Sequence, residues 1–152
     1  MRYTQKDTIL ALKNSGILKG DTVFFTTGLG FLGMPDIEEV SSIDSICLFM
    51  LNSIKTVLGT KGTILIPTYS YTFGSNKKHK LPIFDPQKTD SMIGPFSNFF
   101  IKQNGVIRSH DPMISIAGLG PKSKEILNNT PPTSYGKGCI FERILKIKNA
   151  KY

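Results

Sequence analysis

The segment between residues 42 and 67 constrains the fold most strongly. Its first part predicts a helix that begins at Ser41 or Ser42 and runs to about Leu58, because apolar side chains recur at helical spacing. These apolar positions are Ile43, Ile46, Cys47, Met50, Leu51, Ile54 and Leu58. After a turn at residues 59–62, residues 63–67 (TILIP) are apolar without alternation, which is typical of a strand buried on both faces. An amphipathic helix that leads into such a strand predicts an α/β fold.

The N-terminal part of the chain repeats this order of elements. Thr4, followed three residues later by Asp7, predicts the cap of a helix over residues 5–14. Residues 22–26 (TVFFT) then form a short, β-prone run. The order helix, strand, helix, strand predicts a layered α/β sheet with at least one parallel pair and with helices packed on it. We expect one domain over residues 1–152.

The second half of the chain predicts shorter elements. We expect helices over residues 95–103, 121–127 and 139–147, and strands over residues 106–107 and 114–117. No further strand is expected in the tail, residues 148–152, to close the sheet. The connection from residue 68 to residue 90 is long, and such a loop is usually functional or disordered. Its aromatic residues argue against disorder: Tyr69, Tyr71, Phe73 and Phe84.

The charge of the chain leaves several classes of ligand open. There are 19 basic and 11 acidic residues, a net charge of +8. Such a surface attracts nucleic acids or small phosphorylated ligands, although the lysines of a Lys-rich chain can also be simply solvated. The lysines are scattered apart from residues 77–80 (KKHK) and the tail, and no stripe of interleaved aromatic residues accompanies them. We therefore expect no nucleic-acid partner.

Membrane, secretory and metal-binding classes find no support in the sequence. The most apolar run, residues 46–51 (ICLFML), is too short to span a bilayer, and the N-terminus has no continuous apolar stretch typical of a secretory signal. Cys47 and Cys139 have no metal-ligand spacing, and two such thiols fit a reducing compartment. We expect a cytoplasmic protein with no membrane partner and no metal site.

Residues with familiar chemistry are few. Gly28, Gly30 and Gly33 give G-x-G-x-x-G after a strand, but Met34-Pro35 follows where the dinucleotide fingerprint needs a helix. A glycine-rich turn can still bring backbone N–H groups close to a phosphate or a pantetheine amide. His110, next to Asp111, is the one weak candidate for proton transfer, because His79 lies between lysines.

Five ordered segments resemble the aminoglycoside 3-N-acetyltransferase family, whose members transfer acetyl from acetyl-CoA to an amino group of an amino sugar. The segments are residues 20–33 (GDTVFFTTGLGFLG), 62–70 (GTILIPTYS), 84–94 (FDPQKTDSMIG), 108–121 (RSHDPMISIAGLGP) and 134–143 (SYGKGCIFER). The family typically has His-Ser-Ser-Leu at residues 25–28, often has His where Asp111 stands, and has Ser-Pro where Ser134-Tyr135 stands. The resemblance covers nearly the whole chain.

The resemblance implies a set of binding residues. Coenzyme A would lie against Thr26, Thr27, Gly28, Ser91, Met92 and Gly94, with Arg108 and Ser109 assisting at a phosphate or at the pantetheine. The amino sugar would face Tyr69, Phe73 and Asp85. Transfer in the family is direct, within a ternary complex. The general base of the family is associated with a histidine in a segment that follows the part matched here. The chain therefore resembles the N-terminal portion of a family member, and we expect an incomplete family fold. The catalytic residue of this chain is unknown.

Three alternatives stay open at this point. Aminoglycosides are polycations, whereas a chain of net charge +8 would rather recruit an anionic acceptor, such as a nucleotide-linked amino sugar for surface polysaccharide. The chain could also be a truncated, non-catalytic remnant that binds coenzyme A or a partner subunit. A basic nucleic-acid binder is the most distant alternative. The oligomeric state is left open, with a homo-oligomer as one alternative.

Overall fold

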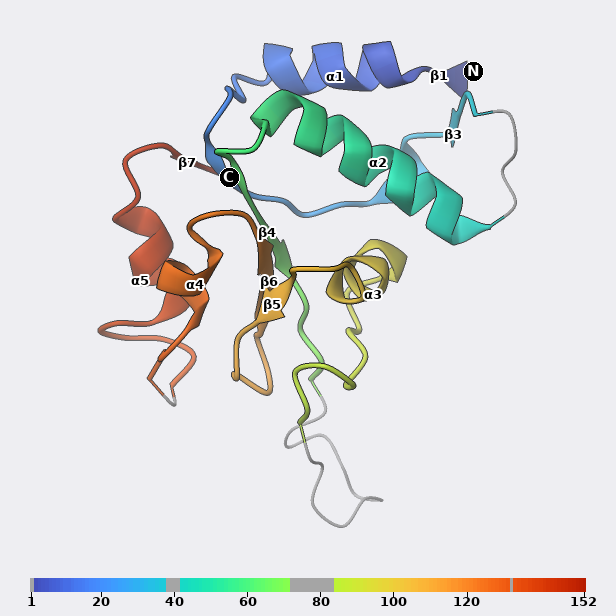
Figure 1. Cartoon of the computed structure of the whole chain (residues 1–152). Coiled ribbons are helices and arrows are strands. Elements are labelled where there is room, and N and C mark those ends of the chain that lie inside the picture. The colour runs from blue at the N-terminus through green and yellow to red at the C-terminus, as the bar shows by residue number, and fades with distance from the viewer. Residues whose placement is uncertain (1, 38–41, 72–83, 132) are drawn as a thin grey trace.

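A five-stranded sheet forms the centre of the fold (Figure 1). The structure is a computed structural model that describes residues 2–37, 42–71, 84–131 and 133–152. The strand order is β5-β6-β4-β2-β7. β2 (Thr22–Phe24) runs parallel to β4 (Thr63–Pro67). β6 (Ile116–Leu119) runs antiparallel to β4, and β5 (Ile107–Arg108) runs antiparallel to β6. The predicted α/β class, with a parallel pair in the sheet, is confirmed.

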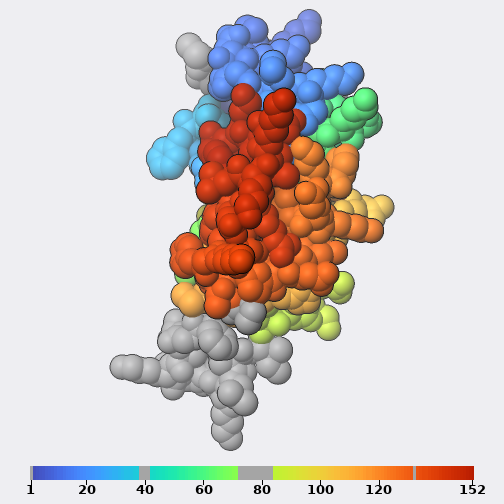
Figure 2. All heavy atoms as spheres, turned by 90° about the vertical axis from the view of Figure 1, so that its left-hand side faces the viewer, coloured from blue at the N-terminus to red at the C-terminus, as the bar shows by residue number. Residues whose placement is uncertain are grey.

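Helices cover both faces of this sheet. α2 (Ile43–Leu58) and α3 (Pro95–Ile101) share one apolar cluster with the sheet, and α1 (Gln5–Asn14) packs on α2. α4 (Ser123–Leu127) and α5 (Ile140–Leu145) share a second cluster with the opposite face. Figure 2 shows this face from outside, where the segments that carry α4 and α5, in orange and red, form the surface.

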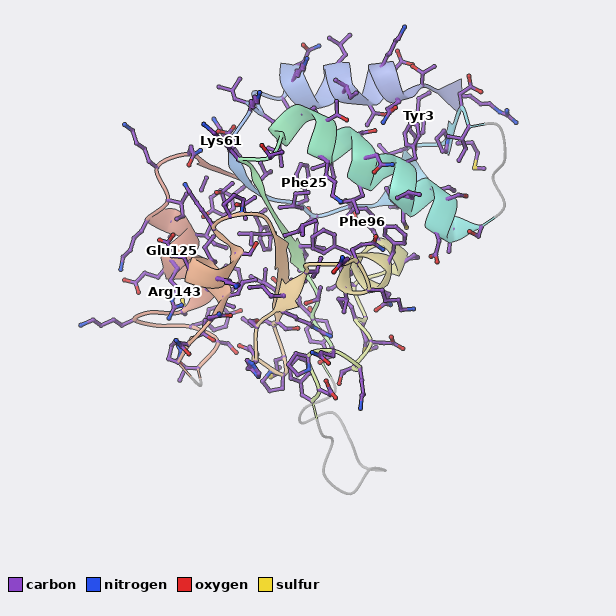
Figure 3. The ribbon with its side chains drawn as sticks, viewed as in Figure 1. Tyr3, Phe25, Lys61, Phe96, Glu125 and Arg143 are labelled. Carbon is purple, nitrogen blue, oxygen red and sulfur yellow. The ribbon has the colours of Figure 1, made fainter. Side chains whose placement is uncertain are left out.

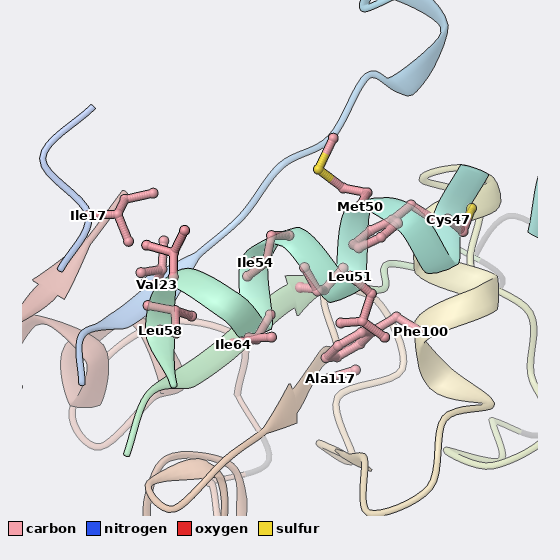
Figure 4. Close-up of a cluster of buried hydrophobic side chains, with 13 residues drawn as sticks. Ile17, Val23, Cys47, Met50, Leu51, Ile54, Leu58, Ile64, Phe100 and Ala117 are labelled. Carbon is pink, nitrogen blue, oxygen red and sulfur yellow. The ribbon is translucent and has the colours of Figure 1, made fainter. Parts of the chain in front are cut away.

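The central strand β4 shows why its sequence does not alternate. Ile64 and Ile66 belong to the cluster beneath α2, part of which is drawn in Figure 4, whereas Leu65 belongs to the cluster of α4 and α5. Successive side chains of a strand point to opposite faces, so a strand that is covered on both faces must be apolar throughout. All five residues of β4 are buried, and the predicted bounds 63–67 are confirmed.

The helix bounds follow from local capping. Thr4 and Asp7 form the predicted capping box, in which the Thr4 backbone N–H donates to the Asp7 carboxylate at 2.8 Å and the Asp7 N–H donates to Thr4 Oγ1 at 3.2 Å. α2 begins after Ser42 and ends at Gly59, whose φ of +64° suits a residue without a side chain. The remaining predicted helices exist with shorter bounds.

The expectation of no strand in the tail is wrong. β7 (Ala150–Lys151) runs parallel to β2 at the edge of the sheet. The Thr22 N–H donates to the Asn149 carbonyl at 3.1 Å, and the Asn149 side-chain amide donates to the Gly20 carbonyl at 2.8 Å. The strand is two residues long and pairs through its backbone, so no side-chain pattern indicates it.

Three further elements lie near the N-terminus. β1 (Arg2–Tyr3) and β3 (Met34–Pro35) form a small parallel pair, and a 3₁₀ turn, η1 (Leu29–Phe31), lies between β2 and β3. The sequence patterns indicated none of the three. No helix in the described part of the chain is both long enough and apolar enough to cross a bilayer.

Candidate functional site

The carboxyl ends of β2 and β4 lie at the same edge of the sheet, because the two strands are parallel. Ligands of open α/β sheets bind at this edge. The loop after β2 carries residues 26–28, and the loop after β4 carries Thr68 to Tyr71. Both loops contain residues that the sequence marks as candidates for binding.

Residues 26–28 form a turn that is held at both ends. The Phe25 N–H donates to the Leu65 carbonyl at 2.8 Å, and the side chains of Phe25 and Leu29 pack against the cluster that contains Phe96. Figure 3 shows Phe25 and Phe96 beneath α2. Between these anchors Thr26 and Gly28 are exposed and Thr27 is half-buried. The turn therefore presents hydroxyl and backbone groups from a fixed position.

Ser91, Met92 and Gly94 lie beside the loop after β4. The Met92 N–H donates to the Tyr69 carbonyl at 2.8 Å, which joins the two segments. Ser91 is buried, its N–H donates to Asn98 Oδ1 at 2.7 Å, and its hydroxyl accepts from the Ile93 N–H at 3.2 Å. The Met92 side chain is 68% exposed. The segment thus offers an outward-facing thioether on a firmly bonded turn.

Arg108 is buried, and its guanidinium donates to groups of three segments. Nε donates to the Ser115 hydroxyl at 3.0 Å, Nη2 to the Thr68 carbonyl at 2.6 Å, and Nη1 to the carbonyls of Thr89 and Pro86. The guanidinium carbon lies 4.9 Å from the centre of the Phe84 ring. Burial lowers the pKa of Arg108 to about 10, so the group stays protonated at neutral pH.

Ser109 is fully buried and bonded in the same way. Its backbone N–H donates to the Ile116 carbonyl at 3.0 Å, and its hydroxyl accepts from the Ile116 N–H at 3.0 Å. The polar groups of Arg108 and Ser109 are therefore directed to the β5–β6 hairpin and to the loops around it.

The residues expected to face the sugar lie in different surroundings. Tyr69 is half-buried, and its ring meets that of Tyr71 edge-on at 5.9 Å. Asp85 organises its own turn, because its Oδ1 accepts from the Gln87 N–H at 2.8 Å and from the Lys88 N–H at 3.3 Å. Phe73 lies outside the described residues.

His110 is exposed and shares a groove with two other candidates. The groove has a volume of about 570 Å³ and is lined by Asp85, Arg108 and His110, together with residues of α3 and β5. Among the described residues, no group of three His, Cys, Asp or Glu side chains could hold a metal ion. Asp85, Arg108 and His110 thus share this groove. Met92 is joined to Tyr69 by a backbone hydrogen bond, and residues 26–28 follow β2 at the same edge of the sheet.

Sequence reasoning missed two side chains near Tyr69. Burial raises the pKa of the Tyr69 phenol, and the neighbouring Tyr71, Tyr135 and Asp111 raise it further. The Ser70 hydroxyl donates to the Pro112 carbonyl at 2.5 Å, which ties the loop of Tyr69 to the segment of Asp111. The signal that could have found them is their departure from the family pattern, which has proline and often histidine at these two positions.

The family model for aminoglycoside 3-N-acetyltransferase matches residues 36–151. The chain belongs to this family. The resemblance to this family is thereby confirmed, and four of the five segments lie within the matched residues. No curated protein matches the sequence.

Several solved structures share the fold of this family member. The YokD protein from Bacillus subtilis superimposes with a TM-score of 0.78 at 20% identity, over 93% of this chain and 60% of that one. AAC-IIIb bound to CoASH gives 0.77 at 19% identity, over 95% and 56%. The aminoglycoside acetyltransferase AAC(3)-Xa gives 0.77 at 23% identity, over 95% and 53%. The chain therefore spans little more than half the length of these structures.

Proposed function

We propose that this chain provides the coenzyme A-binding part of an acetyl-CoA-dependent N-acetyltransferase that acts on an amino group of an amino sugar. The family match over residues 36–151 carries the proposal. A relative of the same fold was solved with CoASH, and another was solved with sisomicin, an aminoglycoside. The proposed cytoplasmic location fits Cys47 and Cys139, which are unpaired and buried.

The residues at the carboxyl edge fit an elongated thioester co-substrate. Thr26 and Thr27 offer hydroxyls, and Gly28 is exposed and carries no side chain that could cover its backbone groups. Met92 offers an exposed thioether on a turn that Ser91 and Gly94 flank. We propose that these six residues line the path of coenzyme A, whose bound acetyl thioester supplies the activated acyl group. Arg108 and Ser109 contribute by holding the loops of the site, since their polar groups are already bonded to those loops.

The reaction sets two further demands on the protein. The acceptor amine must be neutral when it forms the new C–N bond, so a base must take its proton. The oxygen of the tetrahedral intermediate needs hydrogen-bond donors before the C–S bond breaks. Tyr69 fits the second demand, because it is a half-buried hydroxyl donor in the loop after β4, and burial moves the pKa of its phenol further above the ordinary value. His110 is the candidate for the base. We also propose that the acetyl group is transferred directly, within a ternary complex of protein, acetyl-CoA and acceptor.

Thermal unfolding with and without acetyl-CoA tests the binding step. Acetyl-CoA at about a hundred times its dissociation constant should stabilise the protein by roughly 2.7 kcal/mol, which raises Tm by about 5–10 °C for a chain of this size. Thr26→Val should reduce the shift, whereas Thr60→Val, which alters an exposed threonine far from the edge, should not. A cooperative transition that acetyl-CoA leaves unchanged would contradict the proposal.

A second acceptor is favoured by the charge of the chain. The net charge of +8 would attract a nucleotide-linked amino sugar through its diphosphate. Parallel assays with sisomicin and with UDP-glucosamine at low salt distinguish the two acceptors by which amine is acetylated. Binding of acetyl-CoA without transfer to either would assign the chain to a non-catalytic coenzyme A-binding role.

A further inference from the structure

An apolar segment projects from the N-terminal part of the molecule. Phe31 is 97% exposed, Leu32 53% and Met34 46%, so three large apolar side chains within four residues face the solvent. The ring of Phe31 lies beside the Gly28 backbone, because a Cβ on Gly28 would lie 3.0 Å from Phe31 Cδ2. In Figure 2 the segment that carries η1 and β3, in light blue, stands out from the body of the molecule. Single exposed apolar residues are ordinary, whereas a contiguous group of them marks an interaction surface.

A groove opens next to this segment, between α1, α2 and the turn after η1. It has a volume of about 270 Å³, and its lining includes the side chains of Tyr3, Ala11, Leu12, Leu32 and Met50. Because Leu32 lines the groove and directly follows Phe31, a projecting aromatic ring and an apolar groove lie on the same side of the molecule. We call Phe31, Met34 and this groove the N-terminal face.

The charges of the chain are distributed unevenly between this part and the rest. Residues 1–42 contain four basic and five acidic residues, whereas residues 43–152 contain 15 basic and six acidic residues. Beside the groove, Arg2 and Asp36 form an ion pair, with Nη1 3.8 Å from Oδ1. Two copies of a basic protein repel each other least where their charges balance. A strongly charged partner would find no attraction at the N-terminal face, whereas a second copy of the chain would meet no repulsion there.

The arrangement also suits a two-fold contact. In an isologous interface the same surface of each copy meets the other, so a projection and an adjacent groove can fill each other twice. Phe31 and the part of the groove formed by β1, α1 and Leu32 lie outside residues 36–151, which the family model matches. The N-terminal face is therefore largely separate from the part of the chain that defines the family.

We propose that two copies of this chain associate through the N-terminal face, with Phe31 of each copy in the groove of the other. Aromatic side chains that fill a pocket at the centre of an interface contribute most of the binding energy. Phe31 is accordingly the anchor of the contact. The inference does not depend on the proposed transferase function, because neither Phe31 nor the groove belongs to the residues proposed to bind coenzyme A or the amino sugar.

Sedimentation equilibrium of the purified chain tests this interface. At about 100 µM the unchanged protein should have about twice the mass of the 16.8 kDa chain, with a dissociation constant in the micromolar range. Phe31→Asp should raise the dissociation constant about a hundredfold or more, because the anchor is lost and a charge must be buried. Ala11→Glu should have a similar effect, because it places a charge in the groove. Leu10→Glu is the matched control, since Leu10 is the neighbouring exposed residue of α1 and does not line the groove; its dissociation constant should stay within about twofold of the original.

A mixture of the two disrupting variants shows whether Phe31 enters the groove of the other copy. Each variant alone lacks one side of every contact. A mixed dimer keeps one intact contact, between Phe31 of the Ala11→Glu variant and the groove of the Phe31→Asp variant, so the mixture should associate at least about tenfold more tightly than either variant alone. Both substitutions replace exposed side chains, and an unchanged Tm shows that the variants fold.

Three results would overturn the proposal. The first is an unchanged protein that stays monomeric at about 100 µM, well above a micromolar dissociation constant. The second is a pair of variants that associate like the unchanged protein, which would place the contact on another surface. The third is a mixture that associates no more tightly than its components, which would show that Phe31 does not enter the groove.

Discussion

Arg108 and Arg143 use the same chemistry in two different surroundings. Each guanidinium donates to backbone carbonyls of several segments. Arg108 is 8% exposed and lies under the β4 end of the site. Arg143 is half-buried where α4 meets α5, next to Glu125 in Figure 3, and donates to the carbonyls of Asn128 at 2.6 Å and Asn129 at 2.7 Å.

The difference in burial decides how much each arginine stabilises the fold. A buried carbonyl that loses its donor keeps the full cost of its desolvation, whereas an exposed carbonyl can bond to water instead. Thr68 and Ser115, partners of Arg108, are fully buried, whereas Asn128 and Asn129, partners of Arg143, are exposed. The hydrogen bonds of Arg108 should therefore contribute more to the free energy of unfolding than a similar number of hydrogen bonds made by Arg143.

Arg108→Ala is expected to have the largest effect. It removes one donor from the carbonyls of Thr68, Thr89 and Pro86 and from the Ser115 hydroxyl, and Thr68 and Ser115 keep only the hydrogen bonds to each other. The free energy of unfolding should therefore fall by about 3–5 kcal/mol. Tm should fall by on the order of 10 °C. Arg2→Ala is the matched control, because Arg2 is exposed and its ion pair with Asp36 spans 3.8 Å. Equal effects of the two variants would show that burial does not set the weight of Arg108.

Arg108→Lys keeps the positive charge of the side chain and removes the planar guanidinium with its several N–H donors. One ammonium cannot reach the hydrogen-bond acceptors of three segments at once. We expect a loss of about 2–3 kcal/mol in chemical denaturation, between the unchanged protein and Arg108→Ala. Stability equal to that of the unchanged protein would mean that charge alone holds these loops together.

Arg143→Ala should cost only about 1–2 kcal/mol, since water can replace most of its bonds. Its clearer effect should be local, because Arg143 also anchors the Gly138 carbonyl and hence the loop of Tyr135. Hydrogen exchange at residues 136–138 should speed up, whereas exchange in β4 should not. Faster exchange in β4 as well would indicate that Arg143 supports the whole sheet.

Glu142→Gln should have the smallest effect, and only in a defined pH range. The hydrogen bond from Lys146, with that from Gly138, lowers the pKa of the Glu142 carboxyl. A carboxyl whose pKa is lower in the folded state stabilises the protein above its unfolded pKa of about 4.3, and this contribution is lost as the pH falls through the folded pKa. Glu142→Gln should therefore lose less stability than the unchanged protein between pH 6 and pH 3. Glu125→Gln, in an exposed position on α4, is the control.

Local signals account for the parts of the fold that the sequence predicted well. The helix at residues 5–14 was predicted with its observed bounds because Thr4 and Asp7 cap it within one turn. β4 was predicted because burial on both faces leaves a continuous apolar run. β7 was missed because it pairs through its backbone with β2, a strand at the other end of the chain (Thr22 opposite Ala150).

The candidate site divides in the same way. The loop after β2 could be predicted, because its glycine and hydroxyl pattern is local, and the binding of coenzyme A by residues 26–28 and Met92 stays a prediction. The place of Tyr135 could not, because its orientation depends on Phe141 of α5 and, through it, on Phe24 of β2. The bonds of Arg108 to Thr68 and Thr89 likewise exist only in the folded chain.

The pairing of β7 with β2 also has a consequence for how the chain folds during synthesis. β2 is made early and finds β4 within about forty residues, but its other edge waits for a strand near residue 150. Contacts of such long sequence separation form late, and an unpaired strand edge exposes the chain to aggregation meanwhile. We therefore expect nascent chains stalled before residue 148 to depend on chaperones more than those that have released β7 from the ribosome.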